Sequence, residues 1–135
     1  KNTKCKEVYG IEISPIAHKY ALENVKKNKL GNKIRLFLGD VRRIMPKINK
    51  KFNRVVMPLP KGGEDFLDLA LKYIKNKGVI HFYDFLHENE FYIAEEKMKR
   101  SCEKLKKKYK ILGIIKCGQY SPRFYRVCVD FEVND

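Results

Sequence analysis

Acidic side chains follow two short β-favouring runs near the start of the chain. Glu12 lies near the end of residues 7–13 (EVYGIEI), and Asp40 follows residues 34–38 (IRLFL) after a single glycine. In open parallel sheets, ligands bind beyond the carboxyl ends of the strands. A carboxylate at such an edge can accept hydrogen bonds from the two hydroxyls of a ribose, or from an exocyclic amine such as adenine N6. The pattern therefore predicts a ribose contact for Glu12 and an adenine contact for Asp40.

Two prolines stand at the end of the third strand-like run. Residues 53–59 (NRVVMPL) have an unbroken apolar centre, which is typical of a parallel strand buried on both faces. Pro58 and Pro60 give this end of the strand a rigid backbone that can present carbonyl oxygens to a reacting base. A plain capping or turn-forming role stays open for each acidic residue alone. Taken together and in this order, the three strand ends favour a ligand that contains a nucleoside.

Alternating strands and helices must position these groups. Ser14 and Pro15 predict an N-cap and the first turn of a helix over residues 15–29. One buried helical stripe is expected from the spacing of Ile16, Tyr20, Ala21 and Val25. Residues 41–48 fit a short helix or a turn, and Gly78 is expected as the C-cap of a helix over residues 64–77.

The rest of the chain predicts one more helix and an antiparallel end. We expect a strand over residues 79–84, a long charged helix over residues 88–110, and closing strands over residues 111–117 and 124–133. This order is typical of an α/β layer fold. No repeat, low-complexity tract or linker divides the sequence, so residues 1–135 are interpreted as one domain.

Charge and composition narrow the classes of partner. Thirty Lys and Arg against sixteen Asp and Glu give a formal net charge of +14, which attracts polyanions and makes nucleic acid the leading partner. A lysine-rich surface without a binding role is the alternative. No apolar run approaches the length of a membrane span, and no signal-peptide pattern is present, so we expect a cytoplasmic protein without a membrane partner.

Cysteine and histidine positions predict no metal site. The chain has no CxxC pair, and its histidines, His18, His81 and His87, have no partner at metal-ligand spacing. His81 is expected to be buried on its strand. The four cysteines are interpreted as reduced thiols: Cys5, Cys102, Cys117 and Cys128.

Two longer runs resemble one enzyme family. Residues 54–71 (RVVMPLPKGGEDFLDLAL) and 78–85 (GVIHFYDF) closely resemble the archaeal and eukaryotic tRNA (guanine-37-N1)-methyltransferases, whose pattern reads roughly RVIMNLPxxAxxFLDxAL and then GVIHYY. The upstream run VYGIEISPIAHKYALENVKKNKL with LGDVRR is similar to the cofactor half of that family, and residues 120–123 (YSPR) resemble its YxPR turn. The MPLPK form is similar to an archaeal subgroup that includes members linked to wyosine synthesis.

The resemblance implies a fold and a cofactor. The fold would be a Rossmann-like class I methyltransferase sheet, mostly parallel with an antiparallel C-terminal strand. S-adenosylmethionine would contact Glu12 through its ribose and Asp40 and Val41 through its adenine, and Ile13 would be a further cofactor-binding residue. Pro58 would border both the methyl donor and, with Pro60, the guanine that is methylated. Many family members carry Asn at the position of Pro58, so a side-chain hydrogen bond from that position is not expected here.

The substrate implied is tRNA, methylated on N1 of guanosine 37. Arg42, Arg43, Lys61 and Arg123 are candidates for phosphate contacts, and Tyr120 for stacking on a base. Strand capping by the two neighbouring arginines, and a turn in which Tyr120 packs down, are the alternatives. Other reactions on this scaffold are methylation of carbon 7 in a wyosine precursor and transfer of an aminocarboxypropyl group; the MPLPK run argues against the latter.

The same resemblance implies that part of the catalytic domain is absent. The family's first strand, its glycine loop, its proposed general base and any upstream tRNA-binding domain would precede Glu12, where none of the eleven residues present fits. We therefore expect a partial domain whose N-terminal half belongs to the same or a separate chain. A non-catalytic RNA-binding fragment or one subunit of a split enzyme is the alternative. The strand of Glu12 and the strand of Met57 should not pair directly, because the first strand would lie between them.

Overall fold

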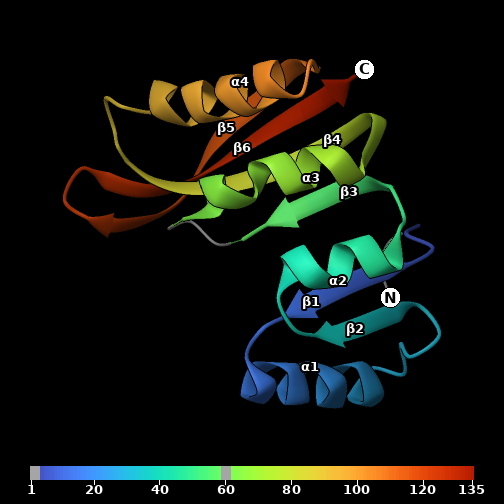
Figure 1. Ribbon diagram of the computed structural model, residues 1–135. Coiled ribbons are helices and arrows are strands. Elements are labelled where there is room, and N and C mark those ends of the chain that lie inside the picture. The colour runs from blue at the N-terminus through green and yellow to red at the C-terminus, as the bar shows by residue number, and fades with distance from the viewer. Residues whose placement is uncertain (1–3, 59–61) are drawn as a thin grey trace. The chain divides into compact units, whose positions relative to one another are not determined.

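The computed structural model describes residues 4–58 and 62–135, and the chain divides into two compact units, Lys1–Asn49 and Lys50–Asp135 (Figure 1). Each unit is described by itself. Among the described residues, no helix has both the length and the apolar character needed to cross a bilayer. The interpretation of residues 1–135 as one partial domain stays a prediction.

The first unit is a pair of parallel strands with two helices. β1 (Val8–Glu12) is followed by α1 (Pro15–Lys27), β2 (Ile34–Leu38) and α2 (Val41–Ile48). β1 and β2 pair in parallel from Val8 with Ile34 to Glu12 with Leu38. The Ser14 cap is as expected, since its hydroxyl accepts from the Ala17 amide at 3.3 Å. This unit therefore brings two strand carboxyl ends side by side.

The buried face of α1 differs from the expected stripe. Ile16 is 70% exposed and Tyr20 is 60% exposed, whereas His18, Ala21 and Val25 are half-buried. Positions 18, 21 and 25 also recur at helical spacing, so the sequence offers two adjacent faces. A two-stranded sheet is narrow and covers only one of them. The tertiary contact, and not the apolar pattern, selects the face that is buried.

The second unit is a four-stranded sheet with helices on one face. Its strands lie in the order β3-β4-β6-β5, with β3 and β4 parallel and the other two pairings antiparallel. The expected α/β class, with parallel pairs and an antiparallel C-terminal end, is confirmed. In chain order the elements are β3 (Phe52–Met57), η1 (Gly63–Phe66), α3 (Leu67–Tyr73), β4 (Ile74–His87), α4 (Tyr92–Lys104), β5 (Lys108–Ser121) and β6 (Phe124–Asn134).

The core of this unit lies between the sheet and its two helices. Alternate residues of β4 and β6, such as Phe82 and Phe131, are fully buried against Leu67 and Leu71 of α3 and Met98 of α4. These apolar side chains supply the main driving force for folding of the unit. The helices cover a single face, and Val56 of β3 is 56% exposed. The expectation that β3 is buried on both faces is therefore wrong for the described residues.

Three element boundaries also differ from expectation. Helix α3 ends at Tyr73, and Gly78 is not its C-cap but lies in β4, opposite Val133 of β6. A side chain at Gly78 would clash with Ile74, because an added Cβ would lie 2.6 Å from its Cγ1. Helix α4 spans only part of residues 88–110. Strand β5 begins at Lys108, because pairing with β6 outweighs the helical propensity of the lysine-rich segment.

The two sheets leave β1 and β3 as edge strands. β1 has β2 as its hydrogen-bonded neighbour among the described strands, and β3 has β4. They belong to different sheets, and the expectation that the strands of Glu12 and Met57 do not pair directly stays a prediction.

Candidate functional site

In the first unit, Glu12 and Asp40 lie at the carboxyl ends of adjacent parallel strands. The Gly39 amide donates to the Glu12 carbonyl at 2.9 Å, which continues the ladder one step past Leu38. Gly39 has a φ of 142°, a conformation that favours glycine. The chain can therefore turn sharply from β2 into α2 and bring the Asp40 carboxylate to the strand end beside Glu12.

Both carboxylates also cap the backbone that follows them. Glu12 Oε1 accepts from the Ser14 amide at 2.8 Å, and Asp40 Oδ1 accepts from the Arg42 amide at 2.8 Å as the N-cap of α2. The capping role considered for each is thus present. Within the described part of the chain, the second oxygen of each carboxylate has no hydrogen-bond partner, so a ligand can still bind there.

Apolar side chains stand next to each carboxylate. Ile13 follows Glu12 directly and is 70% exposed, and Val41 follows Asp40 in the first turn of α2, half-buried. An exposed branched side chain beside a carboxylate offers an apolar contact for the planar ring of a nucleoside. The four cofactor-binding assignments in this unit stay predictions, with a geometry that permits them.

In the second unit, Pro58 follows the last residue of β3. Met57 pairs with Phe82 of β4, so Pro58 lies at the carboxyl edge of the parallel β3–β4 pair and is exposed. This is the edge at which ligands bind in parallel sheets. Pro60 and Lys61 fall within residues 59–61, outside the described residues, so their assigned roles stay predictions.

The basic candidates are placed at two positions. Arg42 and Arg43 are exposed in the first turn of α2. Arg123 lies in the tight turn between β5 and β6, where its Nε donates to Glu88 Oε1 at 2.7 Å. This hydrogen bond, with the charge of Arg123, lowers the pKa of the Glu88 carboxyl. Arg123 therefore already has an anionic partner, which its sequence motif did not indicate.

Tyr120 does not pack down into a turn. It belongs to β5, its side chain is 71% exposed, and its ring centroid lies 4.9 Å from that of Phe85. The turn-rich segment expected over residues 118–122 is instead mostly strand, and only Pro122 and Arg123 connect β5 to β6. An exposed aromatic ring in this position is compatible with stacking on a base.

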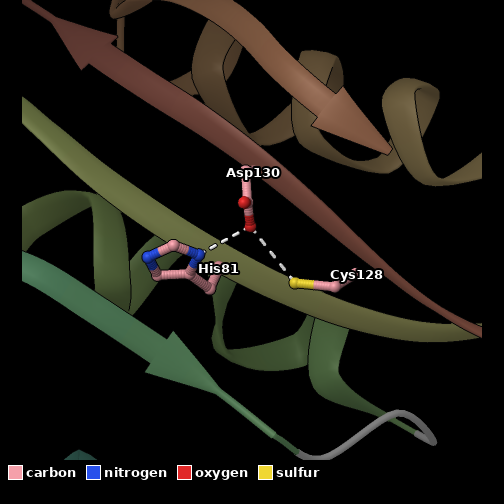
Figure 2. A group of neighbouring side chains, drawn as sticks. All are labelled: His81, Cys128 and Asp130. Carbon is pink, nitrogen blue, oxygen red and sulfur yellow. Dashed lines mark hydrogen bonds and ion pairs between the residues drawn. The ribbon is translucent and has the colours of Figure 1, made fainter. Parts of the chain in front are cut away.

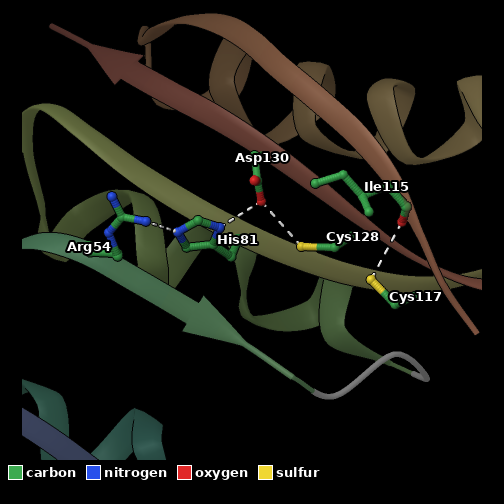
Figure 3. A network of polar contacts seen from close by, with 6 residues as sticks. All are labelled: Arg54, His81, Ile115, Cys117, Cys128 and Asp130. Atoms are coloured by element: carbon green, nitrogen blue, oxygen red, sulfur yellow. Dashed lines mark hydrogen bonds and ion pairs between the residues drawn. The ribbon is translucent and has the colours of Figure 1, made fainter. Parts of the chain in front are cut away.

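A polar network that the sequence did not predict crosses the face of the second sheet opposite α3 and α4. Arg54 Nη1 lies 2.7 Å from His81 Nε2, and His81 Nδ1 lies 2.6 Å from Asp130 Oδ1 (Figure 3). The Cys128 thiol donates to the same Asp130 oxygen at 3.2 Å. These residues come from β3, β4 and β6, so only the strand register brings them together. His81 is less buried than expected, with 16% of its side chain exposed.

Three of these side chains have the composition of a metal site. The ligand atoms of His81, Cys128 and Asp130 lie within 4.8 Å of one another (Figure 2). Their hydrogen-bond pattern argues against a metal. Arg54 is a permanent donor, so His81 Nε2 must accept and the proton must stay on Nδ1, where it is shared with Asp130. Burial, together with Asp130, raises the pKa of the Cys128 thiol to about 12, so with no ion bound the thiol stays protonated and donates to Asp130. We interpret the group as a structural tie between strands.

A second ionic group connects η1 to β4 and α4. Asp84 of β4 is only 4% exposed, and its Oδ2 accepts from Lys97 Nζ at 2.8 Å, while Lys97 also lies 3.4 Å from Glu64 of η1. Burial alone would lower the Lys97 pKa, but the two carboxylates outweigh it and raise the pKa. Lys97 thus joins β4, α4 and η1, and fixes the start of the chain beyond residues 59–61.

Comparisons with known proteins identify related sequences over nearly the whole chain. Residues 1–112 match the model of the TRM5/TYW2 methyltransferase domain. A tRNA (guanine(37)-N(1))-methyltransferase Trm5b of Pyrococcus abyssi is 36% identical over 97% of this chain and 38% of its own length. A tRNA(Phe) (4-demethylwyosine(37)-C(7)) aminocarboxypropyltransferase of Methanocaldococcus jannaschii is 35% identical over 96% of this chain and 51% of its own length. The chain thus spans between about a third and about a half of these relatives.

Solved structures show the same similarity. The crystal structure of Trm5b from Pyrococcus abyssi superimposes with a TM-score of 0.87 at 35% identity, over 96% of this chain and 38% of that one. The structure of M. jannaschii TYW2 in complex with AdoMet superimposes with a TM-score of 0.86 at 33% identity, over 99% of this chain and 60% of that one. The structure of a complex of aTrm5 and tRNALeu superimposes with a TM-score of 0.82 at 35% identity, over 96% of this chain and 35% of that one.

Proposed function

This chain belongs to the TRM5/TYW2 methyltransferase domain family, and we propose that the protein containing it transfers the methyl group of S-adenosylmethionine to N1 of guanosine 37 in tRNA. The observation that carries the proposal is the pair of carboxylates at adjacent strand ends, Glu12 and Asp40, in a chain similar to enzymes named for this reaction. Glu12 would accept from the ribose hydroxyls and Asp40 from the adenine amine.

The reaction needs catalytic groups in addition to the residues that would bind the cofactor. Guanine N1 carries a proton at neutral pH, so its attack on the methyl sulfonium needs a base for that proton and a donor for charge on O6. We assign neither role within this chain. Its contribution would be alignment, with Ile13, Val41 and Pro58 bordering the cofactor and Pro58 and Pro60 bordering the guanine.

The remainder of the cofactor site would come from other residues. The relatives extend well beyond the aligned part, since it makes up 38% and 35% of two of them. A glycine loop and first strand, either in the same protein or in a separate chain, would complete the site. A tRNA-binding domain would accompany them, and the reaction would take place in the cytoplasm.

Access to N1 requires that the base leave the stack of the anticodon loop. Extrusion costs a few kcal/mol, which contacts to backbone phosphates can offset. The formal charge of +14 supports such contacts. Arg42, Arg43 and Lys61 are the proposed phosphate contacts. Arg123 keeps this role only with the part of its guanidinium that Glu88 does not occupy.

The names of the relatives add two alternative reactions of the same cofactor. A protein 35% identical to this chain is named for transfer of an aminocarboxypropyl group to carbon 7 of 4-demethylwyosine at position 37, and others are named as 4-demethylwyosine methyltransferases. All these enzymes are named for position 37, so the contacts proposed for Glu12 and Asp40 would serve each reaction. The atom that accepts the group and the group that leaves the sulfonium distinguish them.

One assay separates these possibilities. The protein that contains this chain is incubated with S-adenosylmethionine and unmodified tRNA, and the nucleosides are identified by mass spectrometry. N1-methylguanosine should appear with guanosine at position 37 and should be absent when position 37 is adenosine. Equal methylation of both RNAs would refute the proposal. With tRNA carrying 4-demethylwyosine, a methyl or an aminocarboxypropyl adduct would reveal the alternative reactions.

A non-catalytic role is tested by the cofactor alone. Calorimetric titration of S-adenosylmethionine into the same protein should show binding. RNA binding with no heat from the cofactor would favour an RNA-binding module or a subunit that needs a second chain.

A further inference from the structure

Phe85 of β4, Tyr120 of β5 and Phe124 of β6 lie near one another on the face of the second sheet opposite α3 and α4, close to the tip of the β5–β6 hairpin, whose backbone is drawn in red in Figure 1. We define Phe85, Tyr120 and Phe124 as the aromatic ledge. The Tyr120 ring centroid lies 4.9 Å from that of Phe85 and 6.4 Å from that of Phe124. Tyr120 is 71% exposed, and the two phenylalanines are half-buried beneath it. The outermost ring is thus supported from below and open to a ligand.

Strand register places the ledge opposite to the core. Phe85 pairs with Arg126 and His87 pairs with Phe124, and neighbouring positions such as Leu86 point into the core. Arg126 therefore lies beside Phe85 on the ledge face, exposed, with its Nη2 3.5 Å from the Cys117 carbonyl. A guanidinium near an exposed aromatic ring is a combination that can bind a stacked base together with its phosphate.

The hairpin that carries Tyr120 is clamped to the end of β4. Glu88 accepts from Arg123 Nε at 2.7 Å, and the Glu88 amide donates to the Arg123 carbonyl at 2.9 Å. Arg123 has a φ of 63°, which allows a two-residue connection between β5 and β6. These contacts make Arg123 a positioning residue, since it holds the hairpin so that Tyr120 stays over Phe85.

The ledge lies on the ligand-binding edge of the parallel pair. Met57 pairs with Phe82, and Phe85 is three residues further towards the carboxyl end of β4. At roughly 3.3 Å per residue, the ledge begins about 10 Å beyond the end of β3. That offset along β4 suits a nucleotide that flanks the one Pro58 would border.

We propose that the aromatic ledge stacks an unpaired base that flanks the methylated nucleotide, with Arg126 facing its phosphate. The inference rests on the proposed function for the identity of the RNA and assigns Phe85, Phe124 and Arg126 a binding role. The charge of +14 favours RNA over an acidic or apolar protein segment as the occupant, because every nucleotide adds a phosphate for the basic surface.

The test uses tRNA that keeps guanosine 37 and carries 2-aminopurine at position 36 or 38. Affinity and bound-state fluorescence are measured for the wild type, Tyr120→Ala, Tyr120→Phe and Phe85→Leu. Base–aromatic stacking predicts that Tyr120→Ala weakens tRNA binding about tenfold and raises the bound-state fluorescence of one of the two probes. Tyr120→Phe should restore both the affinity and the fluorescence of the wild type. Tyr92→Ala is the matched control, because Tyr92 is 57% exposed on α4, which covers the other face.

The outcomes separate this inference from the proposed function. If the wild type methylates guanosine 37 but Tyr120→Ala leaves the tRNA affinity and the fluorescence unchanged, the stacking role of the ledge is refuted and the proposed function is not. The same titrations with a 2-aminopurine-labelled single-stranded oligonucleotide cover the case in which no methylation occurs. A Tyr120-dependent signal there supports the ledge as a base-stacking site, and equal binding by Tyr120→Ala and the wild type refutes it. Binding of a protein segment in place of RNA also refutes it.

Discussion

Arg123 and Glu88 are joined twice, by a side-chain hydrogen bond of 2.7 Å and by the Glu88 amide, which donates to the Arg123 carbonyl at 2.9 Å. The contact links the β5–β6 turn to the end of β4. An arginine that a sequence motif would assign to RNA thus has a partner within its own unit. The pH dependence of the contact follows from the carboxylate.

The contact between Arg123 and Glu88 should weaken in acid. Arg123 lowers the pKa of Glu88 below its ordinary value of 4.5, so the contact stabilises the folded state above pH 4.5 and is lost as the pH falls through the lowered value. Thermal unfolding of the wild type and Glu88→Gln should therefore differ near neutral pH and converge in acid. Glu96→Gln, which removes an exposed pair with Arg100, should show little difference at any pH. A difference for Glu88→Gln that grows in acid would contradict the assignment.

Glu12→Gln should weaken cofactor binding without unfolding the chain. The amide oxygen can still accept from the Ser14 amide, but the charge that strengthens hydrogen bonds from ribose hydroxyls is lost. Because hydrogen bonds to charged groups contribute about 1.5–3 kcal/mol, calorimetry should report an affinity for S-adenosylmethionine that is at least about tenfold lower. Glu23→Gln on α1 is the control. Equal affinities of wild type and Glu12→Gln would remove Glu12 from the site.

Asp40 has two roles that different substitutions separate. Asp40→Ser keeps a side chain that can cap α2 but is too short to reach an adenine amine, so stability should stay near the wild type while cofactor affinity falls. Asp40→Ala should also lose the cap, at about 1 kcal/mol. Chemical denaturation and cofactor titration of both variants measure the two effects. If Asp40→Ser binds the cofactor as the wild type does, Asp40 serves only as a cap.

The tie between β4 and β6 should fix the tautomer of His81. Donation from Arg54 to Nε2 requires the proton on Nδ1, which NMR of the imidazole nitrogens can detect. Asp130→Ala removes the acceptor of both His81 and Cys128 and should cost about 1–3 kcal/mol of unfolding free energy. The exposed Asp65→Ala is its control. A proton on Nε2, or stoichiometric zinc in the purified protein, would instead favour a metal site.

The features that sequence predicted are those set by neighbouring residues. Ser14 and Asp40 cap the helices that follow them, and both strand ends in the first unit carry the expected acidic residue. These features depend on turns of a few residues, and the capping side chains of such turns can be recognised in the sequence. The α/β order and the parallel pairs follow from the alternation of strands and helices for the same reason.

Features set by register or by tertiary contact were not predictable. The partners Arg54, His81 and Asp130 meet because β3, β4 and β6 align at one register, and a shift of one residue would move His81 to the other face. Gly78 resembled a helix end, yet pairing with β6 places it in a strand. The apolar spacing of α1 did not identify its buried face, because two adjacent faces have the same spacing. The sequence did not identify the partner of Arg123 either, because several carboxylates were available to it.

A crystal structure of the protein that contains this chain, bound to S-adenosylmethionine, would test the central claim most directly. The account predicts both ribose hydroxyls within hydrogen-bond distance of the Glu12 carboxylate and the adenine amine near Asp40, with Ile13 against the ring. A nucleoside bound away from the carboxyl ends of β1 and β2 would contradict it.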